Sequence, residues 1–225
     1  MRNSTVAGAR ATQHGGCLYM VGARQLRSHL ADPIIAPECG DLTVDWDATD
    51  MGTCTAAGVG GGAYIGDSAV TVSRLAVHTS TAKSGAGVAL ITSQLTATRT
   101  TVRDNTATAQ GGGVYAMASG VNADRCQLLR NVAETGGGVH AFLSTVVLAD
   151  TTLDDNIAVN QGGAMSVGDG PVTLTRCQVN GNTAGSGGGV SAVASKVTVH
   201  GTVVEGNLYV PRTHTVATNA GALAD

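Results

Sequence analysis

The stretch "TATAQGGGVYAMASG" (residues 106–120) places three consecutive glycines directly before a short apolar segment. Three glycines return in "ETGGGVHAFLS" (134–144) and "GSGGGVSAVAS" (185–195), and two glycines followed by alanine stand in "NQGGAMSVGDG" (160–170). Glycine loses more backbone entropy on folding than any other residue, so a glycine run is a poor way to stabilise a single turn. Its return at intervals indicates a position that every structural repeat must build from glycine.

The spacing of these motifs is nearly constant. Taking the first glycine of each motif as origin gives steps of 24, 26, 25, 26 and 25 residues, at Gly61, Gly85, Gly111, Gly136, Gly162 and Gly187. A fixed period in this range is typical of a solenoid. On this alignment the first repeat is predicted to be one residue shorter than the others.

A polar column follows the glycines. Twenty residues after five of the origins stands an asparagine, and the first repeat carries Ser80 there; the asparagines are Asn105, Asn131, Asn156, Asn182 and Asn207. Asparagine tolerates the left-handed backbone conformation, and stacked amides can bond one another in a ladder. We expect this structural role rather than a catalytic one, because a catalytic residue is needed once and not in every repeat.

Apolar columns indicate how each repeat folds. Three residues past the origins stand Tyr64, Val88, Val114, Val139, Met165 and Val190. Segments such as "PVTLT" (171–175) and "SKVTV" (195–199) alternate apolar and polar residues, which is the period of a strand with one buried face. No 3.6-residue period is present, and a coil of this size cannot bury its apolar face alone. The sequence therefore predicts an all-β fold, a parallel β-helix of about seven coils of about 25 residues, each with three short strands.

The ends of the chain depart from the repeat. We divide the 225 residues into an N-terminal segment (1–14), an irregular first coil (15–60), regular repeats (61–207) and a C-terminal tail (208–225). The first coil contains "ADPIIAPECGD" (31–41), whose prolines do not suit a central strand, so an insertion of about twenty residues is expected. The tail is expected to be a truncated coil, as in a piece of a longer protein.

Composition narrows the possible partners. The net charge is −3 with 13% charged residues, which argues against nucleic acid as a partner. No apolar run is long enough for a membrane span. The five cysteines form no CxxC pair and no Cys/His cluster, so neither a metal site nor a cofactor is predicted, and the redox state of the cysteines stays open. Cys126 and Cys177 are expected to be small interior residues without a disulfide between them.

The paired motifs resemble those of a known family. The first motif reads GGAY (61–64), GGGV (111–114, 136–139, 187–190) and GGAM (162–165), and the second reads VRDN (102–105), LLRN (128–131), LDDN (153–156), VNGN (179–182) and VEGN (204–207). With valine or leucine in place of phenylalanine, this resembles the GGA-aliphatic and F-x-x-N repeats of polymorphic outer membrane proteins. The resemblance implies a right-handed parallel β-helix of the pectin-lyase-like superfamily, in an adhesin at the cell surface or outside the cell.

One exposed column is a candidate ligand ridge. Four basic side chains and one acidic side chain share one register position; they are Arg74, Arg99, Arg125, Asp150 and Arg176. Either Asp150 neutralises Arg125 and Arg176, or the column binds an anionic glycan or an acidic partner. Tyr115 is the one clear outward aromatic residue on this alignment. The histidines are expected to be solvated, and these are His14, His29, His78, His140, His200 and His214.

No catalytic residue is predicted, because neither three carboxylates nor a Ser/His/Asp set falls on one face of adjacent coils. The predicted function is an extended scaffold of a surface or secreted protein, which contacts a glycan or a cell-surface protein in adhesion. The alternative is a carbohydrate-active enzyme, a polysaccharide lyase or hydrolase, on the same scaffold.

Overall fold

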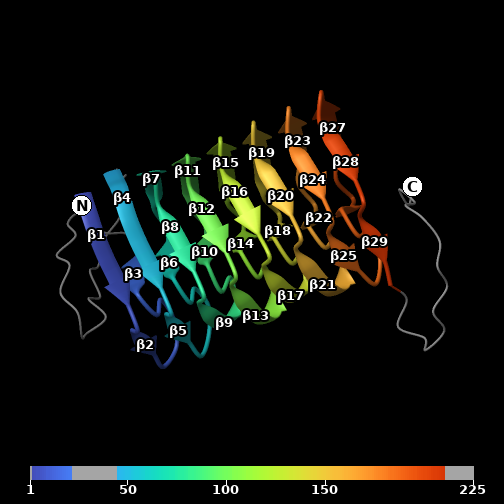
Figure 1. Ribbon diagram of the computed structural model, residues 1–225. Helices are drawn as coiled ribbons and strands as arrows, with labels where there is room; N and C mark the ends of the chain where they lie inside the picture. The colour runs from blue at the N-terminus through green and yellow to red at the C-terminus, as the bar shows by residue number, and fades with distance from the viewer. Residues whose placement is uncertain (1, 22–44, 211–225) are drawn as a thin grey trace.

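The computed structural model describes residues 2–21 and 45–210, and in them the chain winds as a stack of coils from the N-terminal to the C-terminal end (Figure 1). Every pair of neighbouring strands is parallel, because each strand lies beside the equivalent strand of the next coil. The described residues hold strands in three sheets and no helix. The predicted all-β parallel β-helix is therefore confirmed.

Sheet C takes one strand from each of seven coils. Its strands are β3 (Leu18–Val21), β6 (Ala63–Gly66), β10 (Val88–Ile91), β14 (Val114–Met117), β18 (Val139–Phe142), β22 (Met165–Gly168) and β26 (Val190–Val193).

Sheet B has eight strands. They are β2 (Arg10–Ala11), β5 (Thr55–Ala56), β9 (Thr81–Ser84), β13 (Thr106–Gln110), β17 (Val132–Thr135), β21 (Ile157–Gln161), β25 (Thr183–Ala184) and β29 (Leu208–Tyr209).

Sheet A has fourteen strands, because most coils contribute two. They are β1 (Arg2–Ala7), β4 (Asp45–Gly52), β7 (Ala69–Ser73), β8 (Ala76–His78), β11 (Gln94–Thr98), β12 (Thr101–Arg103), β15 (Gly120–Asp124), β16 (Gln127–Leu129), β19 (Thr145–Ala149), β20 (Thr152–Asp154), β23 (Val172–Thr175), β24 (Gln178–Asn180), β27 (Val197–His200) and β28 (Val203–Glu205). Strand β4 pairs with both β7 and β8, so it is continuous where later coils bend. A regular coil thus has four short strands, and the prediction of three was wrong.

The register of the first regular coil differs from the prediction. Val88 lies opposite Ala63, and Tyr64 lies opposite Ala89. The left-handed glycine of this coil is Gly60 (φ 75°), one residue before Gly61. With Gly60 as the origin, the first repeat has the same length as the others. The alignment that made this repeat one residue shorter was therefore wrong. Ala63, rather than Tyr64, faces the interior.

One continuous apolar core runs along the axis. Val139 is 1% exposed and lies between Val114 and Met165 of the neighbouring coils. Cys126 and Cys177 lie in the same core as free thiols. Like side chains therefore stack on like at each register position.

Left-handed residues form the corners of the coils. Besides the glycines, non-glycine residues with φ near +50° recur, among them Thr92, Arg99 and Asp104. The Asn column itself is not left-handed: the preceding residue takes this conformation, as Asp104 does before Asn105. That part of the prediction was wrong, since the backbone bends one residue earlier and thereby turns the asparagine inward.

The inward asparagines form a ladder along one corner. Asn105 Nδ2 donates to Asn131 Oδ1 (3.0 Å), and Asn131 Nδ2 donates to Asn156 Oδ1 (3.1 Å). The same oxygens also accept the backbone N–H of the asparagine in the preceding coil, and the amides donate to carbonyls such as that of Val102 (2.9 Å). These contacts satisfy backbone groups that the bend removes from the sheets.

Candidate functional site

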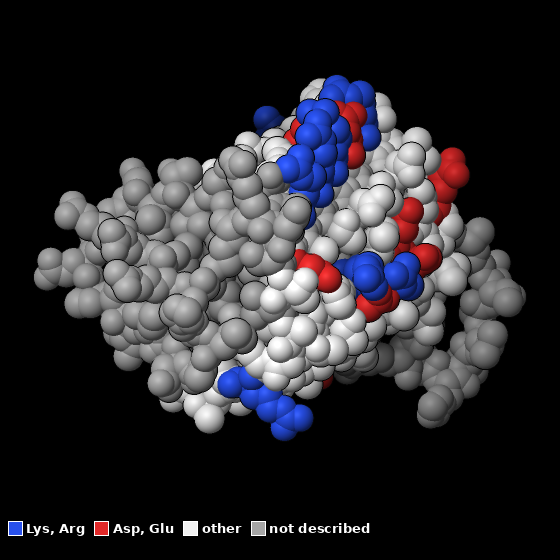
Figure 2. Space-filling model, turned by 60° about the vertical axis from the view of Figure 1, so that its left-hand side comes forward, with Lys and Arg blue, Asp and Glu red and all other residues white. Residues whose placement is uncertain are grey.

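The predicted arginine column lies along one edge of the coils, where basic side chains gather beside acidic ones (Figure 2). Each member of the column is exposed and has a left-handed backbone conformation at a corner of its coil, with φ between 47° and 54°. The members are Arg74, Arg99, Arg125, Asp150 and Arg176. The structure thus brings these five residues to one edge.

Part of this column is neutralised by carboxylates. Arg176 forms a bidentate pair with Asp150, with Nε–Oδ1 and Nη2–Oδ2 distances of 2.8 and 2.7 Å. These bonds hold the pKa of Asp150 below its usual value. Arg125 forms its close ion pair with Asp124 of its own coil, at 2.8 Å, and its charge also helps to lower the pKa of Asp150. Exposed pairs of this kind contribute little to stability.

A second group of charges lies farther along sheet A. Asp104 accepts hydrogen bonds from Arg130 (2.7 Å) and Arg103 (2.7 Å). The bond from Arg130 is the main cause of the lowered pKa of Asp104. The side chains of Arg130 and Arg103 are therefore both paired with the Asp104 carboxylate.

An aromatic column on the outer face of sheet C was missed in the sequence. Tyr19 lies opposite Tyr64, and Tyr115 lies opposite His140, all at one register position with Ala89 between the two pairs. The ring centroids of Tyr19 and Tyr64 are 5.0 Å apart, and those of Tyr115 and His140 are 5.7 Å apart. The wrong register of the first coil had placed Tyr64 inside, which hid the column.

The tyrosine rings lie against the sheet rather than projecting into solvent. A Cβ at Gly66 would come within 3.1 Å of the Tyr64 ring, so glycine makes room for it. The Tyr115 hydroxyl donates to Met117 Sδ at 3.5 Å. Burial raises the pKa of both tyrosines, and both rings are half-buried.

His140 also belongs to this column, so the prediction that it is solvated was wrong. It is half-buried against Tyr115, and burial lowers its pKa. Its Nδ1 is buried and makes no hydrogen bond. An apolar ring face, rather than a polar partner, therefore holds this imidazole.

The outer face of sheet C carries no charged side chain at its two outward columns. Exposed apolar residues adjoin the rings, including Met117 (39%), Phe142 (40%) and Val193 (61%). The outward positions are Tyr19, Val21, Tyr64, Gly66, Ala89, Ile91, Tyr115, Met117, His140, Phe142, Ser166, Gly168, Ser191 and Val193. We call this surface the aromatic face.

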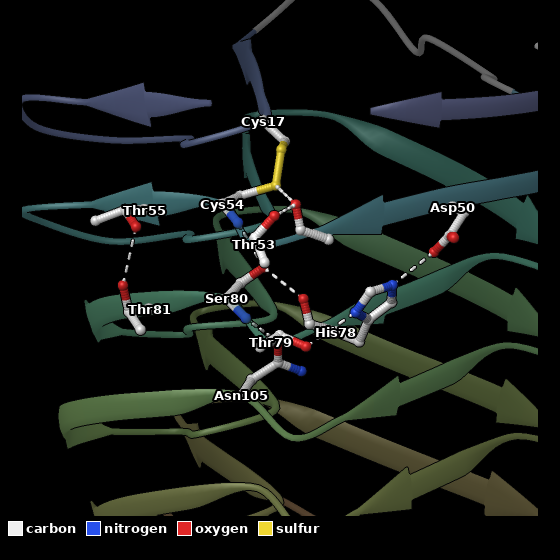
Figure 3. The surroundings of a disulfide bond; sticks show 11 residues. Cys17, Asp50, Thr53, Cys54, Thr55, His78, Thr79, Ser80, Thr81 and Asn105 are labelled. Carbon is white, nitrogen blue, oxygen red and sulfur yellow. Dashed lines mark hydrogen bonds and ion pairs between the residues drawn. A yellow bond between two sulfur atoms is a disulfide. The ribbon is translucent and has the colours of Figure 1, made fainter. Parts of the chain in front are cut away.

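The structure also joins an Asp, a His and a Thr that the sequence did not bring together. His78 Nε2 is 3.0 Å from Asp50 Oδ1, and its Nδ1 is 3.0 Å from Thr79 Oγ1 (Figure 3). An Asp–His pair of this kind can activate a hydroxyl such as that of Thr79 as a nucleophile. Catalysis by such a nucleophile also needs hydrogen-bond donors that stabilise an oxyanion. The backbone N–H groups of Thr79, Ser80 and Thr53 already donate to Arg103 O, Asn105 Oδ1 and His78 O, so none of these three groups is free to bind an oxyanion.

The remaining histidines add no cluster. His14 stacks on Tyr64 and His200 is exposed, whereas His29 and His214 lie outside the described residues. Within residues 2–21 and 45–210, no three His, Cys, Asp or Glu residues lie together as metal ligands would.

A disulfide closes the N-terminal end of the ladder. Cys17 bonds Cys54, which stands at the register of the Asn column, since Cys54 N–H donates to Ser80 Oγ and Ser80 N–H donates to Asn105 Oδ1 (Figure 3). Cys17 stands at the register of the glycines that face the asparagines in later coils, such as Gly113 beside Asn131. A covalent bond thus joins the two columns here. Cys39 lies outside the described residues.

Comparison with known proteins establishes the class. A family model described as a right-handed β-helix region matches residues 45–208. The chain therefore belongs to this right-handed β-helix family, and the predicted handedness is confirmed with it. The finer resemblance to polymorphic outer membrane repeats stays a prediction.

No curated protein and no solved structure matches the chain. The described part of the chain contains no helix of the length and apolarity that crossing a membrane requires.

Proposed function

We propose that the protein is an extended β-helical scaffold of a secreted or surface-exposed protein, which makes adhesive contacts with a glycan or another protein. The observation that carries the proposal is the aromatic face, an uncharged outer surface of sheet C that runs along the stack of coils. Tyrosine, phenylalanine and methionine are enriched where proteins bind partners, and charged residues are depleted there. An exposed surface of this composition is typical of an interaction site.

The disulfide supports a location outside the reducing cytosol. Structural disulfides form and persist in secreted and surface proteins, and in periplasmic ones. Cys17–Cys54 also ties the coil that carries the irregular segment. The resemblance to polymorphic outer membrane repeats favours the same location.

The arginine column is a second possible contact surface, for anionic glycans. Arg99 makes no side-chain ion pair with another described residue, whereas Arg125 and Arg176 are paired. A partner of this column has to compete with Asp124 and Asp150. We therefore place the column second to the aromatic face.

The test is retention of the purified protein on immobilised partners. The panel comprises heparin, polygalacturonate, cellulose and extracellular-matrix proteins, with release of sugar from the soluble polysaccharides measured in parallel, with and without calcium. A scaffold is retained on at least one partner and depolymerises none. Retention on no partner, or clear depolymerisation, contradicts the proposal, and depolymerisation favours the enzyme alternative.

The same assay tests the arginine column. Replacing Arg99, Arg125 and Arg176 with serine should abolish retention on heparin at low salt while the melting temperature stays nearly unchanged, since exposed charges add little stability. Wild-type protein that is not retained on heparin at low salt would exclude the column as an anion site.

A further inference from the structure

The last described coil presents part of the core to the surface. It consists of β26, β27, β28 and β29, which are edge strands of the three sheets at the C-terminal end of the stack (Figure 1). Val199 and Val204 hold inward register positions and are 49% and 41% exposed. Their equivalents in the preceding coil, Leu174 and Val179, are 1% and 0% exposed. Two apolar columns of the interior therefore reach the surface at this end.

The side-chain hydrogen bonds at the corners all run in one direction along the stack. In the Asn ladder, the backbone N–H of Asn182 donates to Asn207 Oδ1 (2.9 Å). At the corner between sheets C and A, the N–H of Ser119 donates to Ser144 Oγ (3.0 Å). Each coil thus takes side-chain oxygens from the coil that follows it.

This direction leaves donors without acceptors in the last described coil. Thr202 Oγ1 still accepts the N–H of Cys177 (3.1 Å), at the corner in the middle of sheet A. No described residue, however, accepts the backbone N–H of Ser195, Thr202 or Asn207. Edge strands also present a row of unpaired backbone groups. The end therefore offers three corner donors, strand edges and exposed apolar columns, and the coil that fits it supplies oxygen acceptors at those corners.

The pattern disfavours a second copy of the chain at this end. Two C-terminal ends that met would bring corner donors opposite corner donors. At the N-terminal end, Ala9 stands at the register of the Asn column, because its carbonyl accepts the N–H that begins the next strand of sheet B, as Asn131 O does. Alanine has no side-chain oxygen. The inward Met20 of that coil is also 1% exposed, so it is not open to packing against another coil.

The residues that follow this coil in the sequence do not repeat the motif. In the described coils a left-handed glycine stands five or six residues after the Asn-column position, as Gly187 does after Asn182. At this distance after Asn207 stand Arg212 and Thr213. The coil that fits the end is therefore expected on another polypeptide.

We propose that the C-terminal end of the stack binds a strand-forming segment of another protein with the same β-helical repeat, which adds a coil to the three sheets. Such a segment places apolar residues over Val199 and Val204, and Ser, Thr or Asn oxygens at the three corners. Addition of a strand to an exposed sheet edge is a general mode of peptide recognition, in which backbone hydrogen bonds give affinity and side chains give specificity. The contact is separate from the aromatic face and from the proposed adhesive function.

The probe for this site is a labelled synthetic peptide with the sequence of residues 136–160. It is one coil without cysteine, and it carries Ser144, Thr151 and Asn156 at the three corners. Fluorescence anisotropy measures its binding to the full chain. Replacing the three corner residues of the peptide with alanine should weaken binding roughly tenfold or more, because buried donors lose their acceptors. An alanine peptide that binds as tightly as the original contradicts the inference.

Variants of the protein locate the site. Replacing Val199 and Val204 with lysine should abolish peptide binding, because the added coil would bury both charges. The matched control replaces Val203 and Leu208 with lysine. These are outward residues of the same coil with similar exposure (45% and 52%), so the control should bind like wild type. Far-UV circular dichroism and the melting temperature establish that both variants are folded. Equal peptide binding by the two folded variants would overturn the inference.

Two results on the wild-type protein would also overturn it. One is no binding of the peptide, the result expected if residues 211–225 occupy the end. The other is a dimer in analytical ultracentrifugation that the Val199 and Val204 variant dissociates, which assigns the end to a second copy. Neither result bears on the retention assays of the proposed scaffold function, because those assays test other surfaces.

Discussion

The Asn ladder makes the sharpest prediction about stability, through the change Asn156→Ala. Asn156 is fully buried, and its amide is bonded on both sides. Its Nδ2 donates to Leu128 O (2.8 Å) and to Asn182 Oδ1 (3.1 Å). Its Oδ1 accepts from the backbone N–H of Asn131 (3.0 Å) and from Asn131 Nδ2 (3.1 Å).

The magnitude follows from the groups that lose their partners. Alanine leaves the Asn131 backbone N–H and one amide N–H of Asn131 unpaired in a buried corner, and it removes one donor from the Leu128 carbonyl. Each such group costs about 1–3 kcal/mol. We expect the free energy of unfolding to fall by about 4 kcal/mol, which is large against the few tenths expected at an exposed site.

The assay is urea denaturation followed by far-UV circular dichroism, with Asn122→Ala as the matched control. Asn122 is exposed on β15, so the same chemical change should alter stability by less than about 0.5 kcal/mol. Equal effects of the two changes, or a loss below about 1 kcal/mol for Asn156→Ala, would refute the reasoning, because the ladder would then not carry buried backbone groups.

Three further changes test the core, the disulfide and the aromatic face. Val139→Asp should lower the free energy of unfolding by more than about 4 kcal/mol, because it buries an unpaired carboxylate. The control Val147→Asp changes a side chain that is 37% exposed and should lower that free energy far less. Thermal melts compare the two variants. Cys54→Ser should lower the free energy of unfolding by about 4 kcal/mol, the loop entropy for a separation of 37 residues, and a reductant should then have no further effect. Burial lowers the pKa of His140 in the folded state, so the unfolded chain binds more protons below its usual pKa of 6.5. Stability should therefore fall as the pH drops from 6.5 through the folded pKa, and His140→Gln should reduce that loss in urea melts at pH 5 and pH 7; an unchanged pH dependence would contradict the assignment.

The sequence by itself determined the architecture. A solenoid repeats one set of local requirements in every coil, so each register position leaves a column at a fixed period in the sequence. The column of Val114, Val139 and Met165 therefore identified an interior stack, and the Asn column identified a ladder. The spacing needed no knowledge of distant contacts, because each coil contacts only its neighbours.

Only the tertiary structure decided the register of the first coil and the features that depend on it. The run Gly60–Gly62 allows two alignments with later motifs, and strand pairing alone selects the one that places Tyr64 outside. The aromatic face follows from that choice. A one-residue slip exchanges the two faces of a strand, so the sequence alignment inverted this strand.

The corners, the disulfide and the ion pairs were likewise decided by the assembled coils. Left-handed residues such as Leu143 and Arg99 have no local signature, since the stacked neighbours rather than glycine impose that conformation. Cys17 and Cys54 are 37 residues apart in the sequence and meet only in the folded chain. The register position that Asp150 shares with Arg176 already allowed their pairing, but the pairing of Arg125 with Asp124 of its own coil was set by side-chain geometry, which the linear order of residues does not encode.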